Sequence, residues 1–444
     1  MALHHTVRRL SRLALSVAAV FAVTACAAAT TETGTSETSA SEADSATPVT
    51  LSFAIQVPDP ENGEPQIWAA VKAFEEQNPN ITVELTGQPV AEHLQRLQIA
   101  GQSDTLPDMF WIYDANAREL NEAGKLLNIR PILEEGGVLE YYPDTTVAGF
   151  SDGDVMYGQP SGALITGLWY NKAILEENGL EVPVTFDDLL EVSRTLSAQG
   201  ITTISNGSNQ ATFSVWSFLR NLSNFGWDDK VEGLLDGSVS YNNADFAKLY
   251  EHIAELRDAG AFADNVATTN YDQIVARFTS GEAAFVDGGI WMAGPIQESP
   301  IAEYAGFWIG PEFSDGVGEQ KIAMNVPAAP FAYSAKSAED PNKLAAMEKW
   351  IVFWAGQEAA QIQVDFARAP STTWEVSLPD DQFVFQAALE AAFAEGNRAP
   401  SNQPDLMVPT SVATAMYDSI YGVILGQLTP DEAMNLVQAA IDAL

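Results

Sequence analysis

The chain has little of the chemistry on which disulfide-rich folds and metal sites depend. It contains one cysteine, Cys26, in 444 residues, so no disulfide can form within it and the folded part must rely on a hydrophobic core. The four histidines offer no zinc-binding spacing, since His4 and His5 begin the chain and His93 and His252 are isolated. No glycine-rich phosphate loop followed by a lysine occurs. We therefore expect neither a metal site nor a cofactor.

Basic residues are also scarce. The chain has 21 lysines and arginines against 60 aspartates and glutamates, and its formal net charge is −39. Such a surface repels nucleic acid and anionic lipid head groups, so we expect no nucleic-acid partner. A ligand recognised through phosphates or several carboxylates is disfavoured, whereas a neutral or cationic ligand is suitable. The alternative is that the acid excess only keeps a secreted surface soluble.

The first 25 residues have the order of an export signal. Three arginines, Arg8, Arg9 and Arg12, precede the apolar stretch "LALSVAAVFAVTA", and Cys26 follows it. This stretch is shorter than the ~20 apolar residues of a membrane-spanning helix, so we interpret it as a cleaved segment. The residues "VTAC" resemble a bacterial lipobox, which implies lipidation of Cys26. An ordinary secretory signal with an incidental cysteine is the alternative.

A polar tract follows the signal. Residues 26–48 are rich in Thr, Ser, Ala and Glu, a composition that buries too little apolar area to offset chain entropy. We expect a disordered tether that holds a globular body near the membrane. The predicted location is the extracellular face of the cell membrane, through a lipid anchor.

From Val49 the sequence alternates predicted strands with predicted helices. The segments "VTLSFAI", "ITVELTG" and "DMFWI" are predicted strands, and "EPQIWAAVKAFEEQNP", "AEHLQRLQIAGQ" and "ANARELNEAGKL" are predicted helices. This alternation predicts an α/β fold with a parallel sheet. Ligands in such sheets lie outside the carboxyl ends of the strands, so a site is expected after "LSFAI" and after "DMFW".

A second block begins near "YGQPSGALITGLWYNKAILEENG". Trp169 and Tyr170 close a predicted strand, and Lys172 opens a helix. In "GEAAFVDGGIWMAG" a small-residue strand is expected to break at Gly288 and Gly289. Further on, "MNVPAAPFAYSA" is predicted to be an extended crossover. The segment "KLAAMEKWIVFWAGQEAAQIQV" is predicted to form one long amphipathic helix, and helices are expected to dominate to the C-terminus.

Five segments carry a family resemblance in their order along the chain: "FEEQNPNITVEL", "LPDMFWIYDANARELNEAGKLLNI", "YGQPSGALITGLWYNKAILEENGLEVPVTFDDLLE", "FTSGEAAFVDGGIWMAG" and "TPDEAMNLVQAAI". They resemble extracellular solute-binding proteins of ABC importers, the carbohydrate-binding family related to maltose-binding protein. The resemblance implies a two-lobed periplasmic-binding-protein-like fold, with ligand between α/β lobes and hinge closure on binding. The expected lobes are residues 49–161 with 327–365, and 162–326 with 366–444. The implied partners of this monomer are a carbohydrate and the transmembrane subunits of an ABC permease.

The resemblance also implies which residues contact the ligand. A sugar ring needs flat aromatic surfaces for its C–H faces and fixed polar groups for its hydroxyls. In the resemblance Trp291, after Gly289, stacks on the sugar; a core tryptophan is the alternative, since the chain has 10. Trp111 and Asp114 match an aromatic residue followed by a carboxylate, although Asp114 is also a good helix N-cap.

Further contacts are expected from loops and from later segments of the chain. Leu164 stands near a position that is acidic in maltose-binding protein, so the sugar preference of that protein should not be transferred. Phe213 and Trp216 are candidate aromatic contacts of the second lobe, but Trp216 has the spacing of a core residue, and we expect it to pack in the interior. The remaining expected ligand contacts are Gln56, Asp59, Gly162, Phe213, Gly289 and Trp374.

Three functions remain open from the sequence. The first is a lipid-anchored receptor that captures a neutral oligosaccharide and performs no covalent chemistry. The second is a surface enzyme that acts on polysaccharide, although the resemblance places no nucleophile or acid/base pair in the cleft. The third is the same binding fold with a cationic or peptidic ligand. We expect the first, and hence no enzymatic activity.

Overall fold

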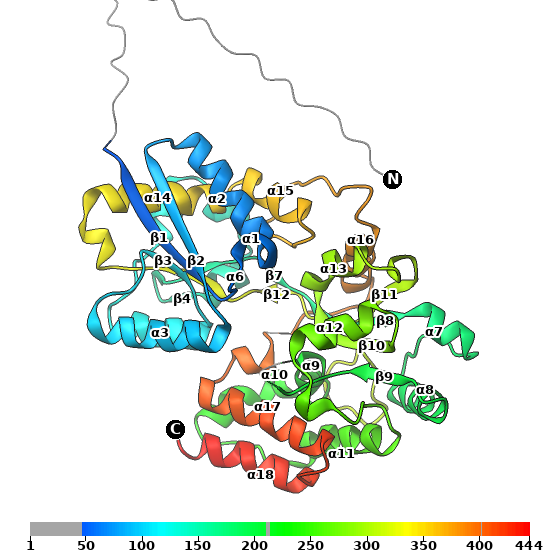
Figure 1. Ribbon diagram of the computed structural model, residues 1–444. Helices are drawn as coiled ribbons and strands as arrows, with labels where there is room; N and C mark the ends of the chain where they lie inside the picture. Colours follow the sequence, from blue (N-terminus) through cyan, green and yellow to red (C-terminus); the bar gives the residue numbers. More distant parts are fainter. Residues whose placement is uncertain (1–46, 210–213, 401) are drawn as a thin grey trace, which may run out of the picture. The chain divides into compact units, whose positions relative to one another are not determined.

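Two separate sheets organise the described part of the chain. The computed structural model describes residues 47–209, 214–400 and 402–444, so the predicted signal, Cys26, all but the last two residues of the predicted tether, and Phe213 lie outside the described residues. We call each sheet, with the helices packed on it, a lobe. The first lobe contains β1 (Val49–Ile55), and the second contains β10 (Ala283–Gly289) (Figure 1).

The first sheet has five strands in the order β2-β1-β3-β13-β6. Strand β1 runs parallel to β2 and β3, as predicted, whereas β13 is antiparallel to β3 and β6. The segment expected to be only a crossover therefore contributes a strand, because Phe331 and Tyr333 are fully buried in the sheet. The partner strands are β2 (Ile81–Gly87), β3 (Met109–Trp111), β6 (Gln159–Pro160) and β13 (Pro330–Tyr333).

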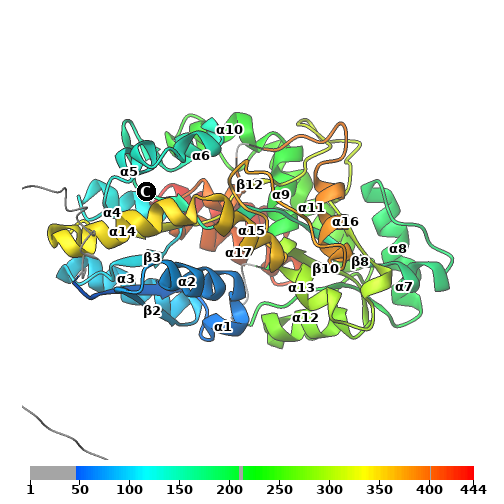
Figure 2. The same cartoon turned by 90° about the horizontal axis from the view of Figure 1, so that it is seen from above.

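Successive side chains of a strand point to opposite faces of the first sheet, so the core of the first lobe consists of two apolar clusters, one on each face. Phe53 and Trp111 pack with Trp350 in one apolar cluster, whereas Phe110 belongs to another cluster with Leu97. The first cluster involves α2 and α14, and the second involves α3 and α4 (Figure 2). The helices of this lobe are α1 (Pro60–Gly63), α2 (Pro65–Gln77), α3 (Val90–Ser103), α4 (Asp114–Glu122), α5 (Arg130–Glu135), α6 (Asp144–Gly149), α14 (Pro341–Trp354) and α15 (Gln357–Asp365).

The helix predicted to span residues 343–364 is two helices. Helix α14 ends at Trp354 and α15 begins at Gln357, with Gly356 as the N-cap of α15. Gly356 has φ −82° and ψ 165°, an extended conformation that interrupts the helical hydrogen bonds. The amphipathic pattern predicted the helical content of this segment but missed the interruption, since glycine within a helical pattern is only a weak signal of its end.

The second sheet has four strands in the order β11-β8-β10-β9. Helix α7 begins at Lys172, as predicted, and β8 ends at Asn171, one residue after the predicted end. The predicted break at Gly288 and Gly289 is wrong, because β10 continues through both glycines in antiparallel pairing with β8. The chain turns only after them, in the 3-10 helix η3 (Ile290–Met292). The other strands are β8 (Thr166–Asn171), β9 (Thr202–Ser205) and β11 (Ala305–Trp308).

Helices cover the second sheet with two apolar clusters. Leu168 and Phe285 belong to a cluster with α8, α11 and α17, whereas Trp169 and Val286 belong to one with α12, α13 and α16. The helices are α7 (Lys172–Glu177), α8 (Phe186–Ala198), α9 (Trp216–Asn224), α10 (Trp227–Leu235), α11 (Ala244–Asp258), α12 (Tyr271–Thr279), α13 (Ala293–Gln297), α16 (Phe383–Ala392), α17 (Thr410–Ile424) and α18 (Pro430–Ile441). Across the described ranges, no helix is long and apolar enough to cross a membrane.

Two short strands carry the chain between the lobes. Strand β7 (Ala163–Leu164) lies between β6 and β8 in the sequence, and β12 (Val326–Pro327) lies between β11 and β13. They pair antiparallel, so both passages run side by side (Figures 1 and 2). A third passage joins α15 to α16. The first lobe thus combines residues that are distant in sequence. A separate hairpin pairs β4 (Ser151–Asp152) with β5 (Val155–Met156).

Candidate functional site

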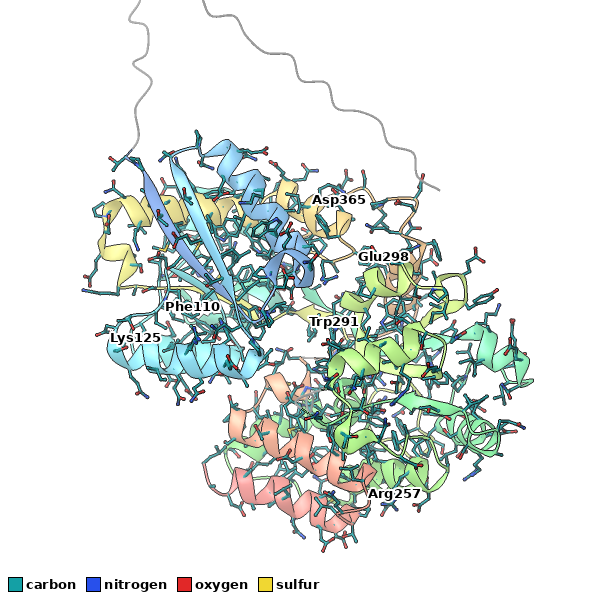
Figure 3. The ribbon with its side chains drawn as sticks, in the orientation of Figure 1. Phe110, Lys125, Arg257, Trp291, Glu298 and Asp365 are labelled. Carbon is teal, nitrogen blue, oxygen red and sulfur yellow. The ribbon has the colours of Figure 1, made fainter. Side chains whose placement is uncertain are left out.

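A cavity of about 350 Å³ draws its lining from both lobes and from the passages between them. The carboxyl ends of β1 and β3 supply Gln56 and Trp111, as the rule for open α/β sheets predicts. The passage at β7 supplies Gly162, and η3 supplies Trp291 (Figure 3). Four of the predicted contact residues are therefore brought together. The further lining residues are Val57, Glu64, Gln66, Val90, Tyr113, Ser161, Ala163, Leu164, Trp216, Tyr271, Ile290, Ala328, Ala329, Arg368, Ala369, Gln403, Asp405 and Leu406.

Three rings of the second lobe form what we call the aromatic corner: Trp216, Tyr271 and Trp291. Trp216 meets Trp291 edge to face, with centroids 5.0 Å apart and planes at 79°, and meets Tyr271 at 6.4 Å and 85°. The indole Nε1 of Trp291 donates a hydrogen bond of 2.7 Å to the Tyr271 hydroxyl. The corner thus holds aromatic faces at right angles in the cavity lining.

Trp216 corrects a prediction, because it lines the cavity instead of packing in the interior. It is the first residue of α9, whereas the fully buried Leu219 and Leu222 occupy the core face of that helix. A residue at the start of a helix often lies outside the core face, so the position of Trp216 at the start of α9 could have indicated that it lines the cavity. Sequence reasoning also missed Tyr271, the first residue of α12.

Gly289 lies beneath the aromatic corner and is not itself a lining residue. A Cβ placed on Gly289 would lie 2.0 Å from a ring carbon of Trp291, so the indole lies directly against this glycine. The Gly289 carbonyl accepts a hydrogen bond of 2.9 Å from the indole of Trp169. Glycine is required here for close approach of a side chain, not for a turn of the backbone.

The first lobe contributes a second aromatic wall, made by Trp111 and Tyr113. Their rings meet at 4.9 Å and 64°. The carbonyl of Trp111 lies 2.7 Å from Nε2 of the buried His93. Since a carbonyl only accepts, Nε2 carries the proton and donates it. Burial lowers the pKa of His93, which favours this neutral tautomer and fixes the end of β3.

Acidic and amide groups complete the lining. The Nε2 atoms of Gln56 and Gln66 donate to the two oxygens of Glu64, at 3.1 and 2.5 Å. Asp405 accepts a hydrogen bond of 2.6 Å from the Tyr417 hydroxyl, and burial raises the pKa of Asp405 to about 6. Arg368 is the one Lys or Arg in the described lining.

Residues 59–361 match the family model described as bacterial extracellular solute-binding protein. The chain belongs to this family. It resembles an uncharacterized ABC transporter extracellular-binding protein of Pyrococcus horikoshii, with 28% identity over 51% of this chain and 54% of the relative. The maltodextrin-binding protein of Bacillus subtilis is 23% identical, over 83% of this chain and 85% of that relative. Three curated relatives are covered over only 54%, 63% and 56% of their own length.

The solved structures extend the comparison to the fold. A chitin oligosaccharide binding protein superposes with a TM-score of 0.79, at 21% identity, over 89% of this chain and 98% of that one. At this identity the likeness shows the fold alone. The predicted two-lobed periplasmic-binding-protein-like fold is confirmed. In this solute-binding protein the cavity lies where β7 and β12 carry the chain between the lobes.

Two predicted contact residues of the first lobe lie outside the cavity lining. Asp114 is buried, and it accepts hydrogen bonds of 2.9 Å from Arg118 Nε and from the Tyr157 hydroxyl. The N-cap of α4 is Tyr113, so the alternative role of Asp114 as the cap is wrong. The ligand contact of Asp114 stays a prediction. Asp59 is exposed and caps α1, where its side chain accepts from the backbone N–H of Asn62.

Trp374 also lies elsewhere than in the cavity lining. It stacks on Tyr141, with ring centroids 3.3 Å apart and planes at 14°, and its Nε1 donates to the Ala355 carbonyl at 2.8 Å. These contacts attach the segment after α15 to the first lobe. Over the described stretches, no group of three or more His, Cys, Asp or Glu side chains is placed to hold a metal ion.

Proposed function

We propose that this solute-binding protein captures an oligosaccharide free of anionic groups in the cavity between its lobes and delivers it to an ABC permease, as a monomer. The aromatic corner carries the proposal. A pyranose ring has apolar faces that stack on indole, and two faces at right angles suit consecutive sugar units that are rotated against each other. Several relatives are sugar-binding proteins by name, such as the multiple sugar-binding protein of Streptococcus mutans, and this supports a carbohydrate ligand.

Ligand capture would combine stacking of aromatic side chains on the sugar with closure of the two lobes around it. Trp216 and Trp291 stack on the ligand from the second lobe, and Trp111 covers it from the first. Gln56 and the backbone at Gly162 supply polar contacts. The paired strands β7 and β12 would bend as the hinge, since short connecting segments absorb such motion. Closure then gives the permease a surface that differs between the empty and the loaded protein.

Calorimetric titration with neutral oligosaccharides of different linkage tests this function. At least one should bind with a dissociation constant in the micromolar range or below, and the sugar recovered afterwards should be intact. Recovery of cleaved sugar at enzyme-like rates would instead support the surface-enzyme alternative. If no carbohydrate binds while peptides do, the proposal fails.

A further inference from the structure

The cavity lining has unpaired hydrogen-bond acceptors. Among the described lining residues, the buried side-chain atoms without a partner are Gln56 Oε1, Gln66 Oε1 and Asp405 Oδ1. All three are acceptors. A buried acceptor without a donor costs free energy, so this set indicates what a ligand must supply.

The orientation of the two glutamine amides follows from their neighbour. A carboxylate accepts and does not donate, so Glu64 requires the NH₂ group of both Gln56 and Gln66 to point toward it. Their carbonyl oxygens must then point elsewhere. The unpaired acceptors on the first lobe are thus imposed by Glu64.

Asp405 supplies the unpaired acceptor on the second lobe. Its burial costs more free energy than that of the glutamine oxygens, because a carboxylate is charged. Only 6% of its surface is exposed, Tyr417 donates to Oδ2, and Oδ1 has no hydrogen-bond partner of good geometry. Burial raises the pKa of this carboxyl by more than Tyr417 and the neighbouring Gln403 amide lower it. Removal of a carboxylate from water without a cation is costly. Within the described part, no ion pair joins Asp405 to Arg368, whose Nη1 lies 3.3 and 3.4 Å from the carbonyls of Trp291 and Phe366.

The donors of Ser161, Gln403 and Trp291 in the lining are engaged within the protein. Ser161 Oγ donates to the Ala329 carbonyl at 2.7 Å, and Gln403 Nε2 donates to the Trp216 carbonyl at 3.0 Å. The Trp291 indole donates to Tyr271. A ligand with hydrogen-bond donors would pair with the unpaired acceptors of the lining, and a positive charge on the ligand would compensate the charge of Asp405.

We propose that the ligand is an amino sugar oligomer, and that Asp405 selects it by accepting a hydrogen bond from a protonated amino group on a ring held by the aromatic corner. This inference rests on the proposed carbohydrate function. An ammonium group donates three hydrogen bonds and accepts none, which matches the unpaired acceptors. Aromatic faces beside it add cation–π attraction. A ligand carboxylate at the same place would be repelled by Asp405.

Titration near neutral pH with three β-1,4 oligomers of equal length tests the inference: glucosamine, N-acetylglucosamine and glucose oligomers. The glucosamine oligomer should bind about tenfold or more tightly than the other two, as expected for a charge-assisted hydrogen bond. Asp405→Asn should remove this preference, because the amide keeps the shape of the carboxyl group but carries no charge. Asp114→Asn, which changes a buried carboxylate outside the cavity lining, should keep the preference.

The outcomes separate the two proposals. If the glucose or N-acetylglucosamine oligomer binds the wild-type protein as tightly as the glucosamine oligomer, the amino-sugar inference is overturned and the carbohydrate function stands. If none of the three oligomers binds, the amino-sugar inference is overturned, and the titration with oligosaccharides of other linkages decides the carbohydrate function separately. Because the wild-type comparison alone decides this point, the test does not depend on the folding of Asp405→Asn.

Discussion

At the scale of single residues, Trp291 shows how an aromatic side chain is fixed for recognition. Its ring plane is set by contact with Gly289, by the edge-to-face contact with Trp216 and by a hydrogen bond to Tyr271. A ring held in this way loses little conformational freedom when a ligand stacks on it, so more of the contact energy remains for affinity.

Trp291→Ala should therefore lower ligand affinity by about 2 kcal/mol or more, as hot-spot aromatics do, and change the melting temperature little. Trp374→Ala is the matched control. Trp374 stacks on Tyr141 outside the cavity, so its removal should lower stability by about 2 kcal/mol and leave affinity unchanged. Calorimetric titration and thermal melting of both variants check the pair. If Trp291→Ala instead lowers the melting temperature and Trp374→Ala lowers the affinity, then Trp291 is a core residue and Trp374 contacts the ligand.

At the scale of elements, the junction between β10 and η3 decides where the indole lies. Gly289 has φ −144° and ψ −174°, an extended conformation open to any residue, so only the missing Cβ makes glycine necessary. The same strand carries Asp287, which accepts hydrogen bonds from the backbone N–H and the hydroxyl of Ser217. Strand β10 thereby positions both Trp291 and the start of α9, where Trp216 lies.

Gly289→Ala should displace the Trp291 ring without unfolding the strand, because the atom that the new methyl group meets belongs to a side chain. We expect affinity to fall about tenfold or more and the fold to persist. Gly294→Ala, in α13, is the control: a Cβ there meets nothing within 4 Å, and alanine favours a helix by up to about 1 kcal/mol. Equal affinities of the two variants would contradict this role of Gly289.

The link between β10 and α9 also predicts a pH dependence. Burial raises the pKa of Asp287 from its ordinary value of 3.8 to about 7, despite the hydrogen bonds from Ser217 and the charge of Arg220. Between these values the folded protein keeps a proton that the unfolded chain loses. The free energy of unfolding should therefore fall as pH rises from about 4 to about 7, by up to about 1.4 kcal/mol per pH unit from this group.

Asp287→Asn keeps an oxygen that accepts from Ser217 but cannot ionise, so it should remove this part of the slope. Asp405, whose pKa burial raises to about 6, adds a slope of the same sign in both proteins. The difference between the two curves therefore isolates Asp287. Urea unfolding of wild type and variant across pH 5 to 8 measures it. Curves that stay parallel would show that Asp287 ionises at its ordinary pKa in the folded protein.

At the scale of the whole molecule, the sequence predicted more of the fold than of the site. Strands 49–55 and 81–87 were recognised at their observed bounds, because alternating and apolar runs are local signals. The role of Phe331 in the first sheet was missed, since its pairing with Trp111 joins residues far apart in the sequence. The cavity depends on such long-range pairing. For that reason Trp216 and Asp405 were not predicted to line it.

The predicted lipid anchor at Cys26 concerns the location of the whole molecule. If Cys26 carries a lipid, mature wild-type protein should partition into detergent, whereas Cys26→Ala should be recovered in the aqueous phase. Residues 26–48 would then tether the two-lobed body to the membrane while leaving it free to reach a permease. Fractionation of cells that express either protein measures this. A Cys26→Ala protein that stays bound to the membrane would show that another segment anchors it.

A crystal structure of the protein with an oligosaccharide identified by titration would show the ligand's contacts. We expect a sugar ring to stack on Trp291 in the cavity between the lobes, Trp111 to cover the ligand from the first lobe, and Gln66 and Asp405 to accept hydrogen bonds from it. A sugar bound away from the aromatic corner, with Trp291 and Trp216 free of contact, would contradict this expectation.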